Sequence, residues 1–256
     1  GDMLALIDDL GRKDAIWVGH DWGSPVVWNL VSQHPERCRG VASLCVPYAT
    51  IEQGLDFIVG LVDREIYPEE EFPYGQWEYM RFYEENFDGA TRPMDANPRN
   101  FVNLIFRKGS PEGEGKPAGT SMARKAGGML GGASEPPWMP RDEDILGEVE
   151  ASIYAGGLER NGLFGPNSWY MNHAANTEYF ERAPHKVLEL PVLFLHARYD
   201  YTCYTVKGRL AEPMRELCRD LTEQVVDSGH WMAQEKPADV NRHLVRWMAG
   251  KDLIPG

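Results

Sequence analysis

The fold is decided by one short stretch of the sequence, residues 14–23, which reads Asp14-Ala15-Ile16-Trp17-Val18-Gly19-His20-Asp21-Trp22-Gly23. The apolar run at its start is typical of a buried parallel strand. From Ser24 to His34 apolar residues recur at helical spacing, so a helix follows the strand. Asp21 stands at the turn between them, with one glycine two positions before it and another two after. This pattern predicts a strained elbow, in which the central residue adopts an unfavourable backbone angle and small neighbours let strand and helix approach.

Further stretches repeat this alternation of strand and helix. We predict strands at residues 14–19, 40–46, 191–197 and 223–227. Helices are expected at residues 2–10, 24–34 and 208–218 and in the final segment around 240–247. The first of these helices would place Leu4, Ile7 and Leu10 on one face. Strands that alternate with helices indicate an α/β fold with a doubly wound parallel sheet.

Residues 51–187 follow a different pattern, with aromatic-rich helical segments at 77–87, 101–106 and 145–158. Such a length far exceeds the usual connection of ~2–6 residues in α/β proteins. We therefore predict an α/β core at residues 1–50 and 188–256, with an inserted, mostly helical domain at 51–187. Within the insert, residues 109–140 are dense in Gly, Pro, Ser and Lys. Their glycine cluster lacks the preceding strand and G-K-[ST] ending of a phosphate loop, so we expect a flexible loop.

Composition excludes several classes of protein. The 256 residues are 43% hydrophobic and 25% charged, as in ordinary globular proteins. A net charge of −13 argues against a nucleic-acid partner, because the phosphate backbone would be repelled. No stretch has the ~18 consecutive apolar residues of a membrane span, and no secretory signal is present, so a soluble, cytoplasmic protein is expected. Neither a disulfide framework nor a metal site is predicted from the spacing of the four cysteines, Cys38, Cys45, Cys203 and Cys218.

Three ionisable residues directly follow predicted strands: Asp21, Asp200 and His230. The carboxyl ends of parallel strands meet at one edge of a sheet, where sites form. The elbow residue of esterases is serine, whereas an aspartate there can attack an sp³ carbon and form an ester. The chain order nucleophile, acid, histidine also accompanies this elbow. Each residue has a plain structural alternative: Asp21 as a helix cap, Asp200 as the start of a turn, and His230 as a buried, hydrogen-bonded histidine.

Two segments of the insert carry tyrosines: residues 165–170, which end in Tyr170, and residues 77–83, which contain Tyr79 and Tyr83. Together with the elbow, the Asp200 turn and residues 228–237, they make the whole chain similar to the epoxide hydrolases of the α/β-hydrolase fold. The resemblance implies that Tyr170 and Tyr79 face the epoxide oxygen from a cap domain. Tyr83, one helical turn from Tyr79, is the alternative second donor. Each tyrosine could instead be an aromatic that packs under the cap.

The resemblance implies that a small apolar epoxide reacts with water to give a vicinal diol, without a cofactor. Asp21 would attack an epoxide carbon while the two phenols donate to the opening oxygen. His230, oriented by Asp200, would activate water to attack the resulting ester. The backbone N–H of Trp22 would supply half of the oxyanion hole.

One part of the family pattern is missing from this sequence. The family carries an H-G-x-P loop ahead of the elbow, and no such motif precedes Gly19. The chain begins at Gly1, inside a predicted helix that several strands precede in the family. We therefore expect that the first half of the sheet is absent and that the elbow strand lies at an open edge. Such a chain should be less stable and less active than an extended one.

The nearest alternative is a haloalkane dehalogenase, which also uses an aspartate followed by tryptophan. Halide needs N–H donors, often a second tryptophan or an asparagine, whereas an epoxide oxygen needs acidic phenols. Tyr170 favours the epoxide, while Trp169 keeps the dehalogenase open. A third reading is an inactive fragment or binding module. No oligomeric state is predicted.

Overall fold

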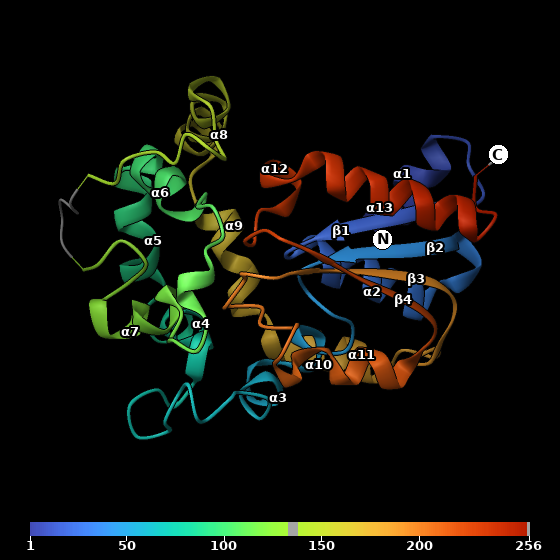
Figure 1. Cartoon of the computed structure of the whole chain (residues 1–256), viewed down its shortest axis with the longest axis horizontal. Coiled ribbons are helices and arrows are strands. Elements are labelled where there is room, and N and C mark those ends of the chain that lie inside the picture. Colours follow the sequence, from blue (N-terminus) through green and yellow to red (C-terminus); the bar gives the residue numbers. More distant parts are fainter. Residues whose placement is uncertain (133–137, 255–256) are drawn as a thin grey trace.

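The computed structural model describes residues 1–132 and 138–254. In this part of the chain, four strands form one parallel sheet in the order β1-β2-β3-β4. The strands are β1 (Ala15–His20), β2 (Cys38–Leu44), β3 (Leu188–Ala197) and β4 (Cys218–Val226). Figure 1 shows helices above and below this sheet. The prediction of an α/β fold with a parallel sheet is confirmed.

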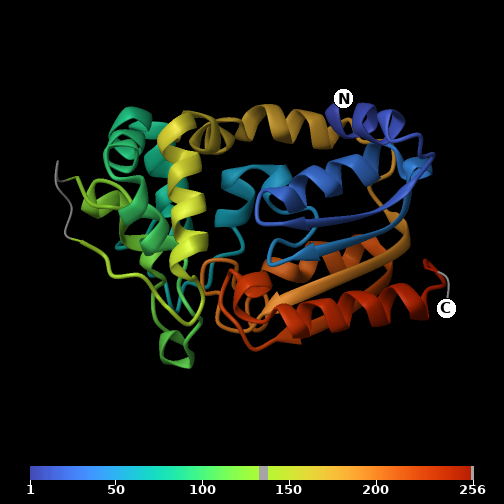
Figure 2. The same ribbon diagram turned by 90° about the horizontal axis from the view of Figure 1, so that it is seen from above.

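Two apolar clusters fix the helices against the two faces of the sheet. One face packs against α2 (Gly23–Gln33), α10 (His173–Glu181) and α11 (Glu212–Leu217), and the other against α13 (Pro237–Gly250) (Figures 1 and 2). The remaining helices are α1 (Asp2–Asp9), α3 (Leu55–Val59), α4 (Glu78–Glu85), α5 (Phe87–Ala96), α6 (Pro98–Ile105), α7 (Ala123–Ala126), α8 (Glu148–Asn161), α9 (Phe164–Ser168) and α12 (Met232–Glu235). Short 3₁₀ turns are η1 (Pro35–Arg37), η2 (Ile51–Gln53), η3 (Gly75–Trp77), η4 (Pro111–Gly113), η5 (Gly119–Met122), η6 (Trp169–Met171) and η7 (Arg209–Ala211).

The two central strands are apolar on both sides because both sides are covered. Val41 and Ala42 on β2 are fully buried, as are the β3 residues 192–195. Among the described residues β1 forms an edge of the sheet, and Val18 on it is 50% exposed. The core therefore lies around β2 and β3.

The parallel register brings the carboxyl ends of the strands together. His20 at the end of β1 pairs with Leu44 at the end of β2, and Ala197 at the end of β3 pairs with Val226 at the end of β4. The segments that follow the four strands therefore start from the same edge of the sheet. Helices α4 to α7 lie beyond that edge, to the left in Figure 1.

Between β2 and β3 the described residues form helices and turns but no strand. Helices α4, α6 and α8 occupy the segments where helices are predicted. The predicted flexible loop at 109–140 differs in part, because η4, η5 and α7 form within it and Gly127 ends α7 in the left-handed conformation. Residues 133–137 of that segment lie outside the described residues.

Three details differ from the sequence prediction. Leu10, which follows the end of α1 at Asp9, is 64% exposed, and Ile7 is the buried residue of that helix. Strand β4 starts at Cys218 rather than at residue 223, and α11 is shorter than the predicted helix at 208–218 because its first turn is the 3₁₀ turn η7.

No described helix has the length and apolar character needed to cross a membrane.

Candidate active site

The turn between β1 and α2 is the strained elbow that the sequence predicts. Asp21 has a φ of 51°, a left-handed conformation that costs a non-glycine residue free energy. A Cβ on Gly19 would lie 2.4 Å from the carbonyl oxygen of Gly23, so only glycine fits at position 19. A Cβ on Gly23 itself would contact nothing, so the close approach depends on Gly19 alone. The helix-cap reading of Asp21 is wrong, because no side chain caps α2, whose N-cap residue is Trp22.

The side chains of Asp21, Asp200 and His230 converge at the carboxyl edge of the sheet. His230 Nδ1 lies 2.6 Å from Asp200 Oδ2, and His230 Nε2 lies 3.1 Å from Asp21 Oδ1. The Asp200 side chain is 3% exposed, whereas that of Asp21 is 38% exposed. One imidazole is therefore held between a buried carboxylate and an accessible one.

Asp200 both shapes a turn and orients the histidine. Its Oδ1 accepts hydrogen bonds from the backbone N–H groups of Thr202, at 3.1 Å, and Cys203, at 2.9 Å. Its Oδ2 faces His230. Asp200 therefore does start a turn, as its structural alternative predicted, and the hydrogen bonds of that turn fix the carboxylate that faces His230.

The pKa values of the three groups shift in the directions that a charged network requires. Burial alone would raise the pKa of Asp21 and of Asp200, but the hydrogen bond and positive charge of His230 lower both pKa values overall. Burial alone would lower the pKa of His230, and the carboxylates of Asp200 and Asp21 raise it well above its ordinary value. The lowered pKa of each carboxyl group and the raised pKa of the imidazole thus have one cause, the attraction between opposite charges in hydrogen-bond contact.

Tyr79 and Tyr170 lie next to each other over the elbow. Their ring centroids are 5.4 Å apart, and the Tyr170 ring meets the Trp22 ring edge-on at 5.3 Å. Burial, together with neighbouring groups that include Asp21, raises the pKa of each phenol well above its ordinary value. Both hydroxyls therefore keep their protons at neutral pH and can act as donors.

Tyr83 is placed differently from Tyr79. Its ring stacks on Tyr170 at 4.6 Å, with an angle of 6° between the planes. Its hydroxyl points to the sulfur of Met94, at 3.8 Å. Only burial shifts its pKa, upward, whereas the charge of Asp21 also acts on Tyr79. This arrangement favours Tyr79 over Tyr83 as the second donor.

Trp22 contributes its main chain to the site and its ring to the surface beside it. The backbone N–H of Trp22 donates to Asp21 Oδ2 at 2.7 Å, so it points at the oxygen that would carry negative charge during attack on an Asp21 ester. The Trp22 ring lies 5.7 Å from the ring of Trp169, which is 44% exposed.

The sequence prediction missed the roles of three side chains that hold the His230 loop. His20 Nε2 and Cys45 Sγ both lie within hydrogen-bond distance of the His230 carbonyl oxygen. Glu235 Oε2 accepts from the backbone N–H of Gly229, at 2.8 Å, and of Gly109 in the insert, at 3.0 Å. Glu235 could be seen in the sequence as an acidic residue shortly after His230. The contacts of His20 and Cys45 end on a main-chain carbonyl, which every residue has, so no residue pattern indicates them.

Among the residues that the structure describes, two sets have side-chain atoms close enough for a metal ion: His20, Cys45 and His230, and Asp200, Cys203 and His230. In the structure both ring nitrogens of His230 face carboxylates. Burial raises the pKa of Cys45 to about 11, so its thiol keeps its proton. The donor set is therefore organised for hydrogen bonding and proton transfer rather than for metal ligation.

A family model described as the alpha/beta hydrolase fold matches residues 1–237. The chain belongs to the α/β-hydrolase fold family. Within this family it is 28% identical over 259 residues to Epoxide hydrolase A of Mycobacterium tuberculosis, an alignment that covers 98% of this chain and 74% of that protein. It is 30% identical over 281 residues to Epoxide hydrolase B of the same organism, with 98% and 76% covered.

Other similar proteins differ more in length. Bifunctional epoxide hydrolase 2 of Sus scrofa is 25% identical over 248 residues, which are 96% of this α/β hydrolase but 41% of that protein. Among solved structures, Epoxide Hydrolase A from Mycobacterium thermoresistibile superposes with a TM-score of 0.72 at 25% identity, over 97% of this chain and 73% of that one.

Proposed function

We propose that this α/β hydrolase converts epoxides to vicinal diols through a covalent ester on Asp21. The observation that carries the proposal is the hydrogen-bonded series Asp21–His230–Asp200, with aspartate in place of serine at the elbow. The two protonated phenols beside it, and the names of the similar proteins, support an epoxide as the substrate.

In the first half-reaction, an Asp21 carboxylate oxygen attacks one epoxide carbon, and the bond between that carbon and the epoxide oxygen breaks. Tyr170 or Tyr79 gives its proton to the released oxygen, which becomes a hydroxyl. Without such a donor the leaving group would be an alkoxide, which is a poor one. The product is a hydroxyalkyl ester of Asp21.

In the second half-reaction, water attacks the carbonyl carbon of the ester and gives a proton to His230. The Trp22 N–H stabilises the negative charge on the carbonyl oxygen. The bond between the acyl carbon and the alkyl oxygen then breaks, His230 protonates that oxygen, and the diol leaves. The remaining carboxyl proton restores the phenol, so epoxide and water are the only reactants.

We also propose that residues 51–187 act as a cap over the site. The support is that Tyr79 and Tyr170 both come from this segment, that their rings contact each other, and that the Tyr170 ring contacts Trp22 of the core. The hydrogen bond from the Gly109 N–H to Glu235 is a further contact between this segment and the core, besides the packing of α10 against the sheet. A cap of this kind would exclude water from the phenols until substrate binds.

The second candidate function is dehalogenation of a haloalkane. Its support is the pair of indoles Trp22 and Trp169, whose rings lie 5.7 Å apart. The exposure of Trp169 and the nearness of Tyr170 to Trp22 weigh against a halide site there.

The test offers the protein styrene oxide and 1-bromobutane in parallel and measures diol and bromide. We expect diol without bromide. Intact mass spectrometry of His230→Gln with styrene oxide should then show a covalent adduct, because only ester hydrolysis needs the base. Bromide release would favour the dehalogenase, and turnover of neither substrate by a folded chain would contradict both proposals.

A further inference from the structure

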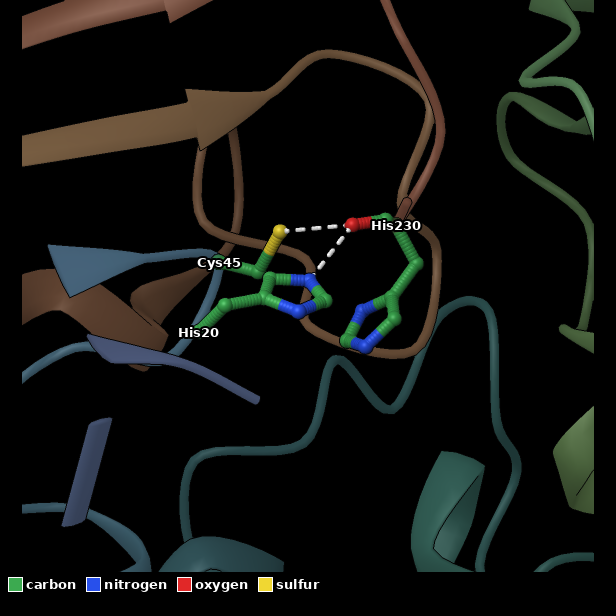
Figure 3. A group of neighbouring side chains, drawn as sticks. All are labelled: His20, Cys45 and His230. Carbon is green, nitrogen blue, oxygen red and sulfur yellow. Dashed lines mark hydrogen bonds between the residues drawn. The ribbon is translucent and has the colours of Figure 1, made fainter. Parts of the chain in front are cut away.

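Two side chains, those of His20 and Cys45, point at the main-chain carbonyl oxygen of His230 (Figure 3). His20 Nε2 lies 2.9 Å from the carbonyl oxygen, and Cys45 Sγ lies 3.2 Å from it. The two side chains come from the carboxyl ends of neighbouring strands, β1 and β2. A carbonyl oxygen has two lone pairs, so this arrangement uses both.

Both side chains act as donors in this arrangement. A carbonyl oxygen only accepts hydrogen bonds, so His20 carries a proton on Nε2 and Cys45 is a thiol. Burial and the charge of His230 lower the pKa of His20, which keeps this ring neutral, and burial raises the pKa of Cys45 to about 11. Two neutral donors therefore hold the carbonyl at neutral pH.

The position of the Cys45 thiol is fixed by strained backbone. Cys45 has a φ of 70°, in the left-handed region that a side chain with Cβ rarely adopts. Its backbone N–H donates to the Leu195 carbonyl at 3.1 Å, and its side chain is fully buried. Strain of this kind persists only where the surroundings over-determine the conformation, and it concentrates at functional sites.

His20 links the candidate base to the candidate nucleophile over a short path. It is the residue next to Asp21 in the chain, and its ring packs against the rings of His230, at 4.8 Å, and Trp231, at 5.2 Å. His230 Nε2 in turn lies 3.1 Å from Asp21 Oδ1. A shift of the His230 main chain would therefore change the distance between base and nucleophile directly.

We propose that His20 and Cys45 are positioning residues that hold the His230 main chain and thereby set the place from which His230 activates water. The proposal rests on the covalent mechanism given above. Neither side chain needs to touch the substrate. Because Asp21 attacks the epoxide without help from a general base, the two donors should affect ester hydrolysis much more than ester formation.

The test compares variants that remove a donor with variants that keep it. Cys45→Ala removes the thiol, whereas Cys45→Ser keeps an O–H donor in its place. His20→Phe keeps a ring without a donor, whereas His20→Gln keeps an N–H near the position of Nε2. Cys218→Ala is the matched control, since Cys218 is also a buried thiol but starts β4, at the opposite end of that strand from the His230 loop.

Rapid mixing with styrene oxide, followed by acid quench and mass spectrometry, gives separate rate constants for formation and decay of the adduct. We expect Cys45→Ala and His20→Phe each to slow adduct decay about tenfold, because small misplacements of a catalytic group have effects of this size or larger. Adduct formation should change less than threefold, and Cys45→Ser and His20→Gln should recover most of the decay rate. Cys218→Ala should match the parent protein in both steps.

Three results would overturn the proposal: unchanged adduct decay in Cys45→Ala and His20→Phe, equal slowing of both steps, or no recovery in either donor-keeping variant. If one pair of variants does not fold, the other pair decides. If the parent protein forms the adduct and any of these three results is found, the positioning role of His20 and Cys45 is rejected and the covalent mechanism stands. Absence of an adduct in both the parent and His230→Gln rejects the covalent mechanism itself.

Discussion

Asp21 and His230 are held in place by main-chain hydrogen bonds, whereas Tyr79 and Tyr170 are held by aromatic rings. On the core side, Asp21 accepts a hydrogen bond from the Trp22 N–H, and the His230 carbonyl accepts hydrogen bonds from His20 and Cys45. On the insert side, Tyr170 stacks on Tyr83 and meets Tyr79 and Trp22 through ring edges.

The difference indicates a division of labour between the two regions. Hydrogen bonds to main chain have narrow geometry, so they suit groups whose distances must be fixed, such as nucleophile and base. Ring contacts cover more area and allow more variation in angle, so they fix the two proposed donors less narrowly. Substitutions in the core side should therefore abolish single steps, while those in the insert side should weaken catalysis by degrees.

Asp21→Ala should have the largest effect. Without the carboxylate no ester forms, so diol production should fall by about 10⁴-fold or more. Product analysis by chromatography measures the rate, and intact mass spectrometry shows whether any adduct forms. Alanine at φ 51° is as strained as aspartate, so a melting curve checks that the variant is folded before its activity is compared. A folded Asp21→Ala protein with substantial diol production would contradict the assignment.

Asp200→Asn should have the next largest effect and should also change the pH dependence. The charge and hydrogen bond of Asp200 raise the pKa of His230, so their removal lowers that pKa. His230 accepts a proton only when neutral, so ester hydrolysis rises with pH, and the midpoint of this rise should move to lower pH in the variant. The maximal rate should fall about 10³–10⁴-fold, because the imidazole loses its orientation. Single-turnover rates at a series of pH values give both quantities, and an unmoved midpoint would contradict the role of Asp200.

On the insert side, Tyr170→Phe and Tyr79→Phe should each lower the rate of ester formation about tenfold, since either phenol can serve as donor. In the double variant the rate of ester formation should fall about 10²–10³-fold, because no donor then remains for the developing oxyanion. Tyr83→Phe is the matched control, because its hydroxyl faces Met94. Ester formation measured by rapid quench separates the variants. A double variant within a few-fold of the parent would make these tyrosines packing residues.

The smallest effect concerns the elbow itself. Gly19→Ala forces a Cβ against the Gly23 carbonyl and should lower the free energy of unfolding by about 1–3 kcal/mol. Gly23→Ala meets open space at the start of α2 and should leave stability within about 1 kcal/mol of the parent. Urea unfolding of the two variants measures this difference. Equal free energies of unfolding would show that β1 and α2 leave room for a Cβ at position 19.

The core side of the site was predictable from sequence because each of its residues follows a strand. Apolar runs locate β1 to β3 within a few residues, and Asp21 and Asp200 follow the runs of β1 and β3, whereas His230 follows β4. Strand β4 was located less well, because it is the far edge of the described sheet and carries polar residues such as Arg219 and Asp220. An edge strand needs no continuous apolar run.

The remaining parts depend on contacts between distant segments. The His20 and Cys45 contacts with His230 span 210 and 185 residues and end on a carbonyl that every residue has, so no residue pattern announces them. The choice between Tyr79 and Tyr83 rests on which hydroxyl turns to Met94, and two tyrosines one helical turn apart do not reveal this.

The most direct test of the covalent mechanism follows the oxygen atoms through one turnover. Excess enzyme reacts with styrene oxide in water enriched in ¹⁸O, and the peptide that contains Asp21 is then analysed by mass spectrometry, with His230→Gln as a control that should stop before water enters. If water attacks the ester carbonyl, ¹⁸O appears in the Asp21 carboxylate and the diol of this first turnover carries none. If the diol carries ¹⁸O and Asp21 carries none, water attacks the epoxide directly and the covalent account is wrong.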